Sequence, residues 1–144
     1  MLLRQRSEII LPKNYTPSDV ELYMIDMHTE YFRTELVKKR SLLQDEWTTL
    51  DEQIHSSADV DIDVVDKANH DVILFSGIKR LESIQKSITS IDLSLDDIEN
   101  KKYGYCKKTG KEIGIKRLLA NPEAKLCIDA QENEDININA YEES

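Results

Sequence analysis

Residues 68–100 read ANHDVILFSGIKRLESIQKSITSIDLSLDDIEN, and this stretch decides the fold class. Its apolar residues recur mostly at steps of three and four, which places them along one side of an α-helix. They are Ala68, Val72, Phe75, Ile78, Ile84, Ile88, Ile91, Leu95 and Ile98. Gly77 interrupts the run at a cost of about 1 kcal/mol. The pattern alone leaves open whether it marks a bend or a close approach of another helix.

A second apolar stripe lies upstream and supplies a packing partner. We expect its helix to begin at residues 16–19, where Thr16 can cap, Pro17 suits the first position and Asp19 can complete a capping box. The stripe comprises Ile25, Phe32, Leu36, Leu43, Trp47, Leu50 and Ile54. Two stripes of similar length, joined by the short polar stretch at 55–63, predict an antiparallel helical hairpin.

The chain therefore divides into four expected segments of a mainly α fold. Residues 1–18 form an N-terminal arm, and 19–102 form a long coiled-coil hairpin with its tip at 55–68. Residues 103–132 form a small zinc-finger-like knuckle with a short C-terminal helix. Residues 133–144 are rich in Asn and Glu and predict a flexible tail.

Composition excludes several classes of function. The 144 residues carry a net charge of −9, which repels nucleic acid. The best basic run, Lys107, Lys108, Lys111, Lys116 and Arg117, is short, so we expect no direct DNA binding. No apolar stretch approaches 18 residues, and the first residues lack a signal-peptide pattern. We expect a cytoplasmic protein, most simply a monomer, with reduced thiols.

The segment 103–118 reads YGYCKKTGKEIGIKRL, and LCIDA follows at 126–130. The spacing is that of a two-knuckle zinc site, but its four positions hold Cys106, Thr109, Cys127 and Ala130. Structural zinc needs four donors, and alanine offers none. We therefore expect a vestigial site with two buried cysteines and a turn hydrogen bond from Thr109. Zinc binding and a disulfide between the cysteines stay open as less favoured alternatives.

This knuckle string resembles the C-terminal signature of the DksA/TraR family of transcription factors. The resemblance extends over about residues 19–132 and includes Tyr23-Met24, Phe32-Arg33 and the string DVVDKA at 63–68. It implies a hairpin that enters the secondary channel of RNA polymerase and alters initiation-complex stability, with no enzymatic activity. The family's tip residues fall on Asp63, Asp66 and Ala68. Some members have likewise lost part of the cysteine set and fold without zinc.

The family's best-known members also respond to guanosine tetraphosphate, which a set of basic residues helps to bind. The matching positions here are Ser90, Asn121 and Gln131, and none is cationic. Arg117 is retained at a further position. The resemblance therefore implies weak nucleotide binding and a weak or absent response.

The tip allows other interpretations. Its acids could form a solvated turn that caps the second helix. A calcium loop is rejected because Val64 and His70 stand where glycine and glutamate are required. A two-carboxylate catalytic centre lacks the walls of a pocket. For the whole chain, a coiled-coil adaptor and a Gre-like transcript-cleavage factor stay open. We expect the three histidines to be exposed, and residues 38–40 to be a solvated basic face.

Overall fold

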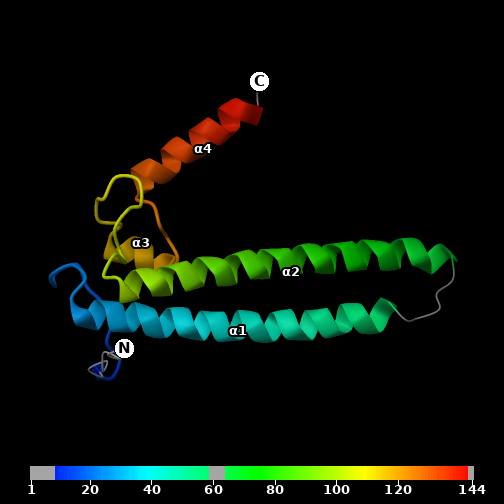
Figure 1. Cartoon of the computed structure of the whole chain (residues 1–144), viewed down its shortest axis with the longest axis horizontal. Helices are drawn as coiled ribbons and strands as arrows, with labels where there is room; N and C mark the ends of the chain where they lie inside the picture. The colour runs from blue at the N-terminus through cyan, green and yellow to red at the C-terminus, as the bar shows by residue number, and fades with distance from the viewer. Residues whose placement is uncertain (1–8, 59–63, 143–144) are drawn as a thin grey trace, which may run out of the picture. The chain divides into compact units, whose positions relative to one another are not determined.

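The structure is a computed structural model that describes residues 9–58 and 64–142. It contains helices α1 (Asp26–Ala58), α2 (Val64–Glu99), α3 (Ile115–Ala120) and α4 (Ile128–Glu142) (Figure 1). Across these described ranges there is no strand, and an isolated antiparallel bridge joins Tyr105 to Glu112. The predicted mainly α fold is confirmed. No described helix is both long enough and apolar enough to cross a membrane.

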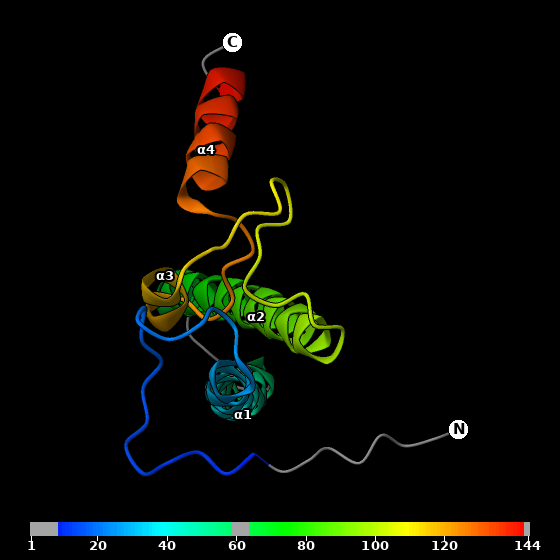
Figure 2. The same ribbon diagram turned by 90° about the vertical axis from the view of Figure 1, so that its left-hand side faces the viewer.

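The chain forms two compact units. The base unit comprises Met1–Leu36 and Ser94–Ser144, and the hairpin unit comprises Val37–Leu93. In the hairpin unit, α1 and α2 run antiparallel and side by side, as the view along the helices also shows (Figure 2). An antiparallel pair of this kind lets each helix bury its apolar side against the other.

The seam of α2 follows a regular alternation of four- and three-residue steps. Its buried and half-buried members are His70, Leu74, Gly77, Leu81, Ile84, Ile88 and Ile91. The predicted apolar stripe of this helix is confirmed at Ile84, Ile88 and Ile91, which are at most 4% exposed. It is wrong for Val72, Phe75 and Ile78, which are 67%, 60% and 46% exposed, and Ala68 is exposed as well.

The seam was misplaced because a glycine occupies one of its positions. A Cβ on Gly77 would lie 3.0 Å from Ile54 Cδ1 and 3.9 Å from Leu50 Cδ1. Gly77 therefore marks a close approach of α1 to α2, which settles the alternative that the sequence left open. A hydrophobic pattern gives no weight to glycine, so the exposed valine and phenylalanine nearby fitted the apparent stripe better.

Two ion pairs connect the helices of the hairpin unit. Arg40 Nε lies 2.7 Å from Asp92 Oδ1, and Arg80 Nε lies 2.8 Å from Glu46 Oε1. Residues 38–40 were expected to form a solvated basic face; Lys38 and Lys39 are exposed, and the partly exposed Arg40 also pairs with Asp92. Both pairs are largely exposed, so water screens them and their contribution to stability is small.

Helix α1 begins at Asp26, and the predicted start at residues 16–19 is wrong. The Glu21 carboxylate accepts hydrogen bonds from the Tyr15 hydroxyl and from the backbone N–H of Ser18. These side-chain hydrogen bonds give the polar groups of residues 15–21 partners within a turn. The segment therefore does not have to form a helix to satisfy its hydrogen-bonding groups. Met24 has a φ of 56°, a left-handed conformation that interrupts any helix before Asp26.

His28 is fully buried in the base unit, contrary to the expectation of three exposed histidines. It lies one helical turn before Phe32, which continues the buried side of α1 through Leu36. Its Nε2 lies 3.5 Å from Glu21 Oε1. His55 is exposed as expected, and His70 is half-buried at the seam of α2.

Residues 133–142 belong to helix α4, which extends beyond the predicted end of the C-terminal helix at residue 132, and the flexibility of this segment stays a prediction. Within α4, Gln131 Nε2 donates to Asp135 Oδ1 at 3.1 Å, a pairing across one helical turn. Lys108 of the knuckle forms an ion pair with Glu134. Local polar contacts of this kind stabilise a helix whose sequence has few apolar residues.

Candidate functional site

The described part of the tip presents two of the three expected residues. Asp66 and Ala68 lie in the first turns of α2 and are exposed. An acid at this position complements the partial positive charge of the helix N-terminus. Asp63, like Asp59 and Asp61, lies outside the described residues.

The tip belongs to a strongly acidic half of the hairpin. Residues 41–80 contain nine acidic and only three basic side chains. Two of those three cations, Lys79 and Arg80, contact neighbours within the unit: Lys79 lies over the Phe75 ring and Arg80 pairs with Glu46. Six of the nine acids lie in the described residues, and this excess of negative charge suits a cationic partner.

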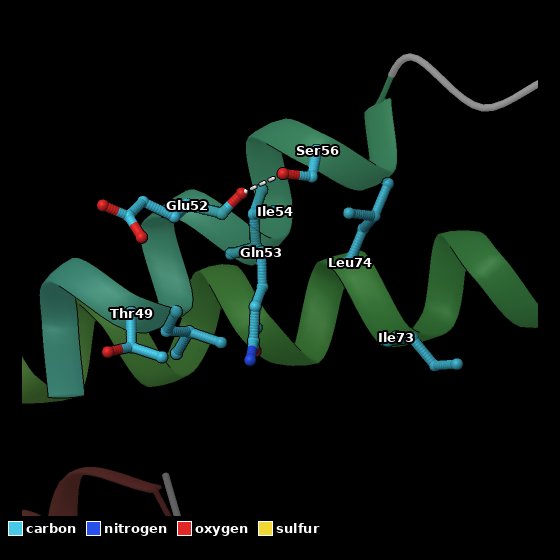
Figure 3. Close-up of a pocket in the computed structure, with 9 residues that line it drawn as sticks. Thr49, Glu52, Gln53, Ile54, Ser56, Ile73 and Leu74 are labelled. Carbon is cyan, nitrogen blue, oxygen red and sulfur yellow. Dashed lines mark hydrogen bonds between the residues drawn. The ribbon is translucent and has the colours of Figure 1, made fainter.

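A groove that sequence reasoning missed lies between α1 and α2 in this half of the hairpin (Figure 3). Its volume is about 670 Å³. Leu50 and Ile54 line it from α1, and Ile73, Leu74 and Gly77 line it from α2. No pattern in the sequence marks this groove, because it depends on how closely α1 and α2 approach at Gly77.

The knuckle positions are largely enclosed in the base unit. Cys106, Cys127 and Ala130 are 3%, 8% and 4% exposed, and both cysteines are free thiols. The predicted burial of the cysteines is confirmed. The Thr109 hydroxyl lies 3.6 Å from Cys127 Sγ and accepts a hydrogen bond from the Lys111 N–H, as the turn prediction required.

The Cys106 sulfur is surrounded by hydrogen-bond donors. Burial raises the pKa of this thiol, but donation from the Thr109 hydroxyl and from the backbone N–H groups of Cys127, Thr109 and Lys108 outweighs burial. The net result lowers the pKa from 9.0 to about 6. A knuckle that offers several donors to one sulfur stabilises a thiolate without a metal ion.

The donor set does not fit structural zinc. The four positions offer two sulfurs, one neutral hydroxyl and one methyl group, whereas zinc needs four donors in a tetrahedron. No group of three or more His, Cys, Asp or Glu side chains able to hold a metal occurs within residues 9–58 and 64–142. The knuckle instead closes through backbone bonds, such as Cys106 N to Lys111 O at 2.7 Å and Ile113 N to Gly104 O at 2.8 Å.

Tyr23 connects the segment that precedes α1 to the knuckle through hydrogen bonds. Its hydroxyl donates to Gly104 O at 2.5 Å and accepts from Gly114 N at 3.1 Å. Its ring packs edge-on against Tyr105. The sequence identified Tyr23 through a family resemblance alone, because nothing in its neighbours along the chain points to a partner 81 residues away.

The expected nucleotide-binding positions make local bonds. Arg117 Nε donates to Leu126 O at 3.0 Å, so this guanidinium supports the knuckle itself. Asn121 Oδ1 accepts from the Glu123 N–H, and Gln131 donates to Asp135. Ser90 is half-buried in the hairpin unit. Among these positions only Arg117 is cationic, and its Nε already donates to Leu126 O, so they offer little to bind an anion.

The chain combines a helical hairpin that carries exposed acids with a cysteine-containing knuckle, and comparisons with known proteins identify its family. The family model described as a prokaryotic dksA/traR C4-type zinc finger matches residues 101–134. The RNA polymerase-binding transcription factor DksA of Caulobacter vibrioides is 30% identical over 133 residues, which cover 91% of this chain and 93% of that protein. The Escherichia coli protein of the same name is 32% identical over 117 residues, covering 81% and 78%.

A solved structure is also similar. The transcription factor DksA2 from Pseudomonas aeruginosa matches with a TM-score of 0.75 and 28% identity, covering 81% of this chain and 90% of that one. The chain belongs to the DksA/TraR family. The predicted family and the predicted helical fold are therefore confirmed.

Proposed function

We propose that this protein is a transcription regulator that binds RNA polymerase through the secondary channel and alters initiation-complex stability without binding DNA. The observation that carries the proposal is the exposed Asp66 at the start of α2, in the acidic half of a two-helix hairpin. Membership of a family whose characterised relatives are named RNA polymerase-binding transcription factors supports it. A polymerase partner also implies a cytoplasmic location.

The hairpin has the dimensions and charge for this role. α2 has 36 residues, which at a rise near 1.5 Å per residue correspond to a length of about 54 Å. A two-helix rod can therefore bring the carboxylates of Asp63 and Asp66 deep into a basic, metal-containing channel. There they compete for cationic side chains, while the small Ala68 permits close contact.

We further propose that the protein is not an enzyme. General acid–base catalysis needs a carboxyl group whose pKa is adjusted by enclosing walls, and Asp66 is exposed on a helix. The relatives are named as transcription factors. A Gre-like cleavage factor would also use acids at a hairpin end, so cleavage of a backtracked transcript is the reaction to assay.

In this proposal the protein is a monomer, and its knuckle folds without zinc and supports the structure. The protein responds little to guanosine tetraphosphate. The support is chemical: two donors of the four are missing, and positions 90, 121 and 131 carry no cation. Arg117, which could pair with a phosphate, already donates to Leu126 O. Prolonged chelation should therefore leave the unfolding midpoint unchanged.

The direct test is binding to purified RNA polymerase, with and without a cleavage factor that occupies the secondary channel. The proposal predicts saturable binding that the competitor abolishes, with no cleavage of a backtracked transcript. Binding that survives the competitor would place the contact elsewhere and support the adaptor alternative. Transcript cleavage that depends on Asp66 would support the Gre-like alternative.

A further inference from the structure

The groove of the hairpin unit has an apolar floor that is open to solvent among the residues that the structure describes. Leu50, Ile54 and Leu74 are half-buried, and Ile73 at the edge is 70% exposed. In Figure 3, Leu74 points toward α1, whereas Ile73 points outward from α2. An exposed aliphatic side chain beside a concave apolar floor is typical of a surface that buries a partner's side chain.

The groove continues along the helices into a section lined by more charged side chains. A neighbouring hollow of about 430 Å³ shares Thr49, Leu50 and Gln53 with the first, and adds Asp45, Glu46 and Arg80. An occupant of both sections would meet aliphatic side chains at one end, and the Asp45 carboxylate and the Glu46–Arg80 ion pair at the other. Such an occupant is an amphipathic segment with an apolar side chain and a cationic one.

Charge narrows the choice of occupant. The described residues among 41–80 carry six acidic and three basic side chains, and Asp45, Glu46 and Glu52 line the two hollows, so the groove lies in a negative field. Nucleic acid is repelled by that field. A second copy of this chain, with a net charge of −9, is repelled as well. A lysine- or arginine-bearing protein segment is attracted.

We propose that this groove docks a cationic, amphipathic segment of RNA polymerase. One aliphatic or aromatic side chain of that segment packs against Leu50, Ile73 and Leu74, and a lysine or arginine faces Asp45, because Glu46 is already paired with Arg80. The identity of the partner rests on the proposed function. The groove thus adds affinity along the shaft of the hairpin, separately from the acids that act at the tip.

Adjacent residues provide a matched test of the apolar contact. Ile73→Ser removes an exposed side chain at the edge of the groove, and Val72→Ser removes one of similar exposure (67%) that does not line it. Because both side chains are exposed, both variants should fold, which circular dichroism checks. We expect Ile73→Ser to weaken polymerase binding about tenfold. Val72→Ser should change it less than about twofold.

A second pair tests the charge. Thr49 lines both hollows, whereas its exposed neighbour Thr48 lines neither and donates to Gln44 O. Thr49→Lys places a cation against the expected cation, so binding at low salt should weaken about fivefold, with a loss that shrinks as salt rises. Thr48→Lys adds the same charge outside the groove and should have less than half that effect.

The outcomes separate this inference from the proposed function. If the wild-type protein does not bind polymerase, the proposed function fails, and the groove assignment fails with it. If the wild type binds but Ile73→Ser binds equally well, the groove assignment alone is overturned. Equal losses in Ile73→Ser and Val72→Ser, or in Thr49→Lys and Thr48→Lys, overturn it too, because the contact would then not depend on the groove.

Discussion

The base unit contains a core of fully enclosed apolar residues, whereas no described residue among 41–80 of the hairpin unit is buried. Tyr103, Ile113, Ile115 and Leu118 of the base unit are all at most 7% exposed. In the hairpin unit, Val72, Ile73 and Phe75 are at least 60% exposed. The difference indicates that the base unit is organised for stability, and that the far half of the hairpin keeps apolar and acidic surface available for contact.

The two units also differ in how their polar groups are bonded. Base-unit side chains donate to specific backbone carbonyls in partly buried hydrogen bonds, as Tyr103 does to Pro122 O at 2.8 Å and Tyr23 to Gly104 O. The hairpin unit relies on exposed ion pairs beside an isoleucine seam. Substitutions in the base unit should therefore reduce stability, and those on the outer hairpin should mainly affect binding.

The largest effect is expected at Gly104. Its φ is +90°, and an added Cβ would lie 2.9 Å from Met24 Cε and 3.0 Å from the Tyr23 hydroxyl oxygen. Gly104→Ala should lower the free energy of unfolding by about 3 kcal/mol, from backbone strain and overpacking together. Urea denaturation followed by circular dichroism measures it. The control is Gly110→Ala, where φ is +72° with open space, and the expected loss is about 1 kcal/mol.

Tyr23→Phe should have the next largest effect. It leaves the Gly104 carbonyl without its donor and the Gly114 N–H without its acceptor, while the ring contact with Tyr105 stays. We expect a loss of about 2 kcal/mol in the same denaturation experiment. Tyr105→Phe, at a partly exposed position, serves as the control and should change stability little. Equal losses in both variants would contradict the anchoring role of Tyr23.

A smaller effect is expected from the titration of Cys106. The pKa of the Cys106 thiol falls from 9.0 to about 6 on folding. The thiolate therefore contributes its full stabilisation of the fold above pH 9. That contribution is lost as the pH falls through about 6. Thiolate absorbance near 240 nm should therefore titrate near pH 6, and Thr109→Val should raise the midpoint. Cys106→Ser should abolish the step, and a wild-type midpoint near 9 would show that the knuckle does not hold a thiolate.

The smallest effect is expected at the outer ion pair. Arg80 lowers the pKa of Glu46 by hydrogen bonding, but both side chains are about half exposed and water screens the pair. Glu46→Gln should leave the thermal midpoint within experimental error and the helical circular dichroism unchanged. A clear drop in the midpoint would mean that the hairpin depends on this pair more than on its isoleucine seam.

The hairpin was predictable from sequence because most of its seam follows a simple repeat. Ile84, Ile88 and Ile91 were assigned correctly, whereas the seam around Gly77 was not, since glycine has no hydrophobicity to detect. The start of α1 was misplaced because the Glu21 carboxylate bonds to Tyr15 and Ser18, a contact that propensity does not describe. The burial of His28 follows from its packing in the base unit, which no local pattern encodes.

The knuckle was predictable in its chemistry, and the groove was not predictable. The spacing of Cys106 and Cys127, with Thr109 between them, was enough to expect two buried thiols and a turn. The groove depends on how closely α1 and α2 approach at Gly77, which is a tertiary property. The roles assigned to Asp66 and Ala68 remain predictions from the family resemblance.

The lifetime of promoter complexes formed by RNA polymerase tests the central claim most directly. The wild-type protein should change this lifetime several-fold. The Asp66→Asn variant should bind polymerase as tightly as the wild type does, but the lifetime should then equal that measured with polymerase alone. Asp71→Asn, an exposed acid further along α2, is the matched control and should act as the wild type does. If Asp66→Asn changes the lifetime as much as the wild type, the tip is not the functional site.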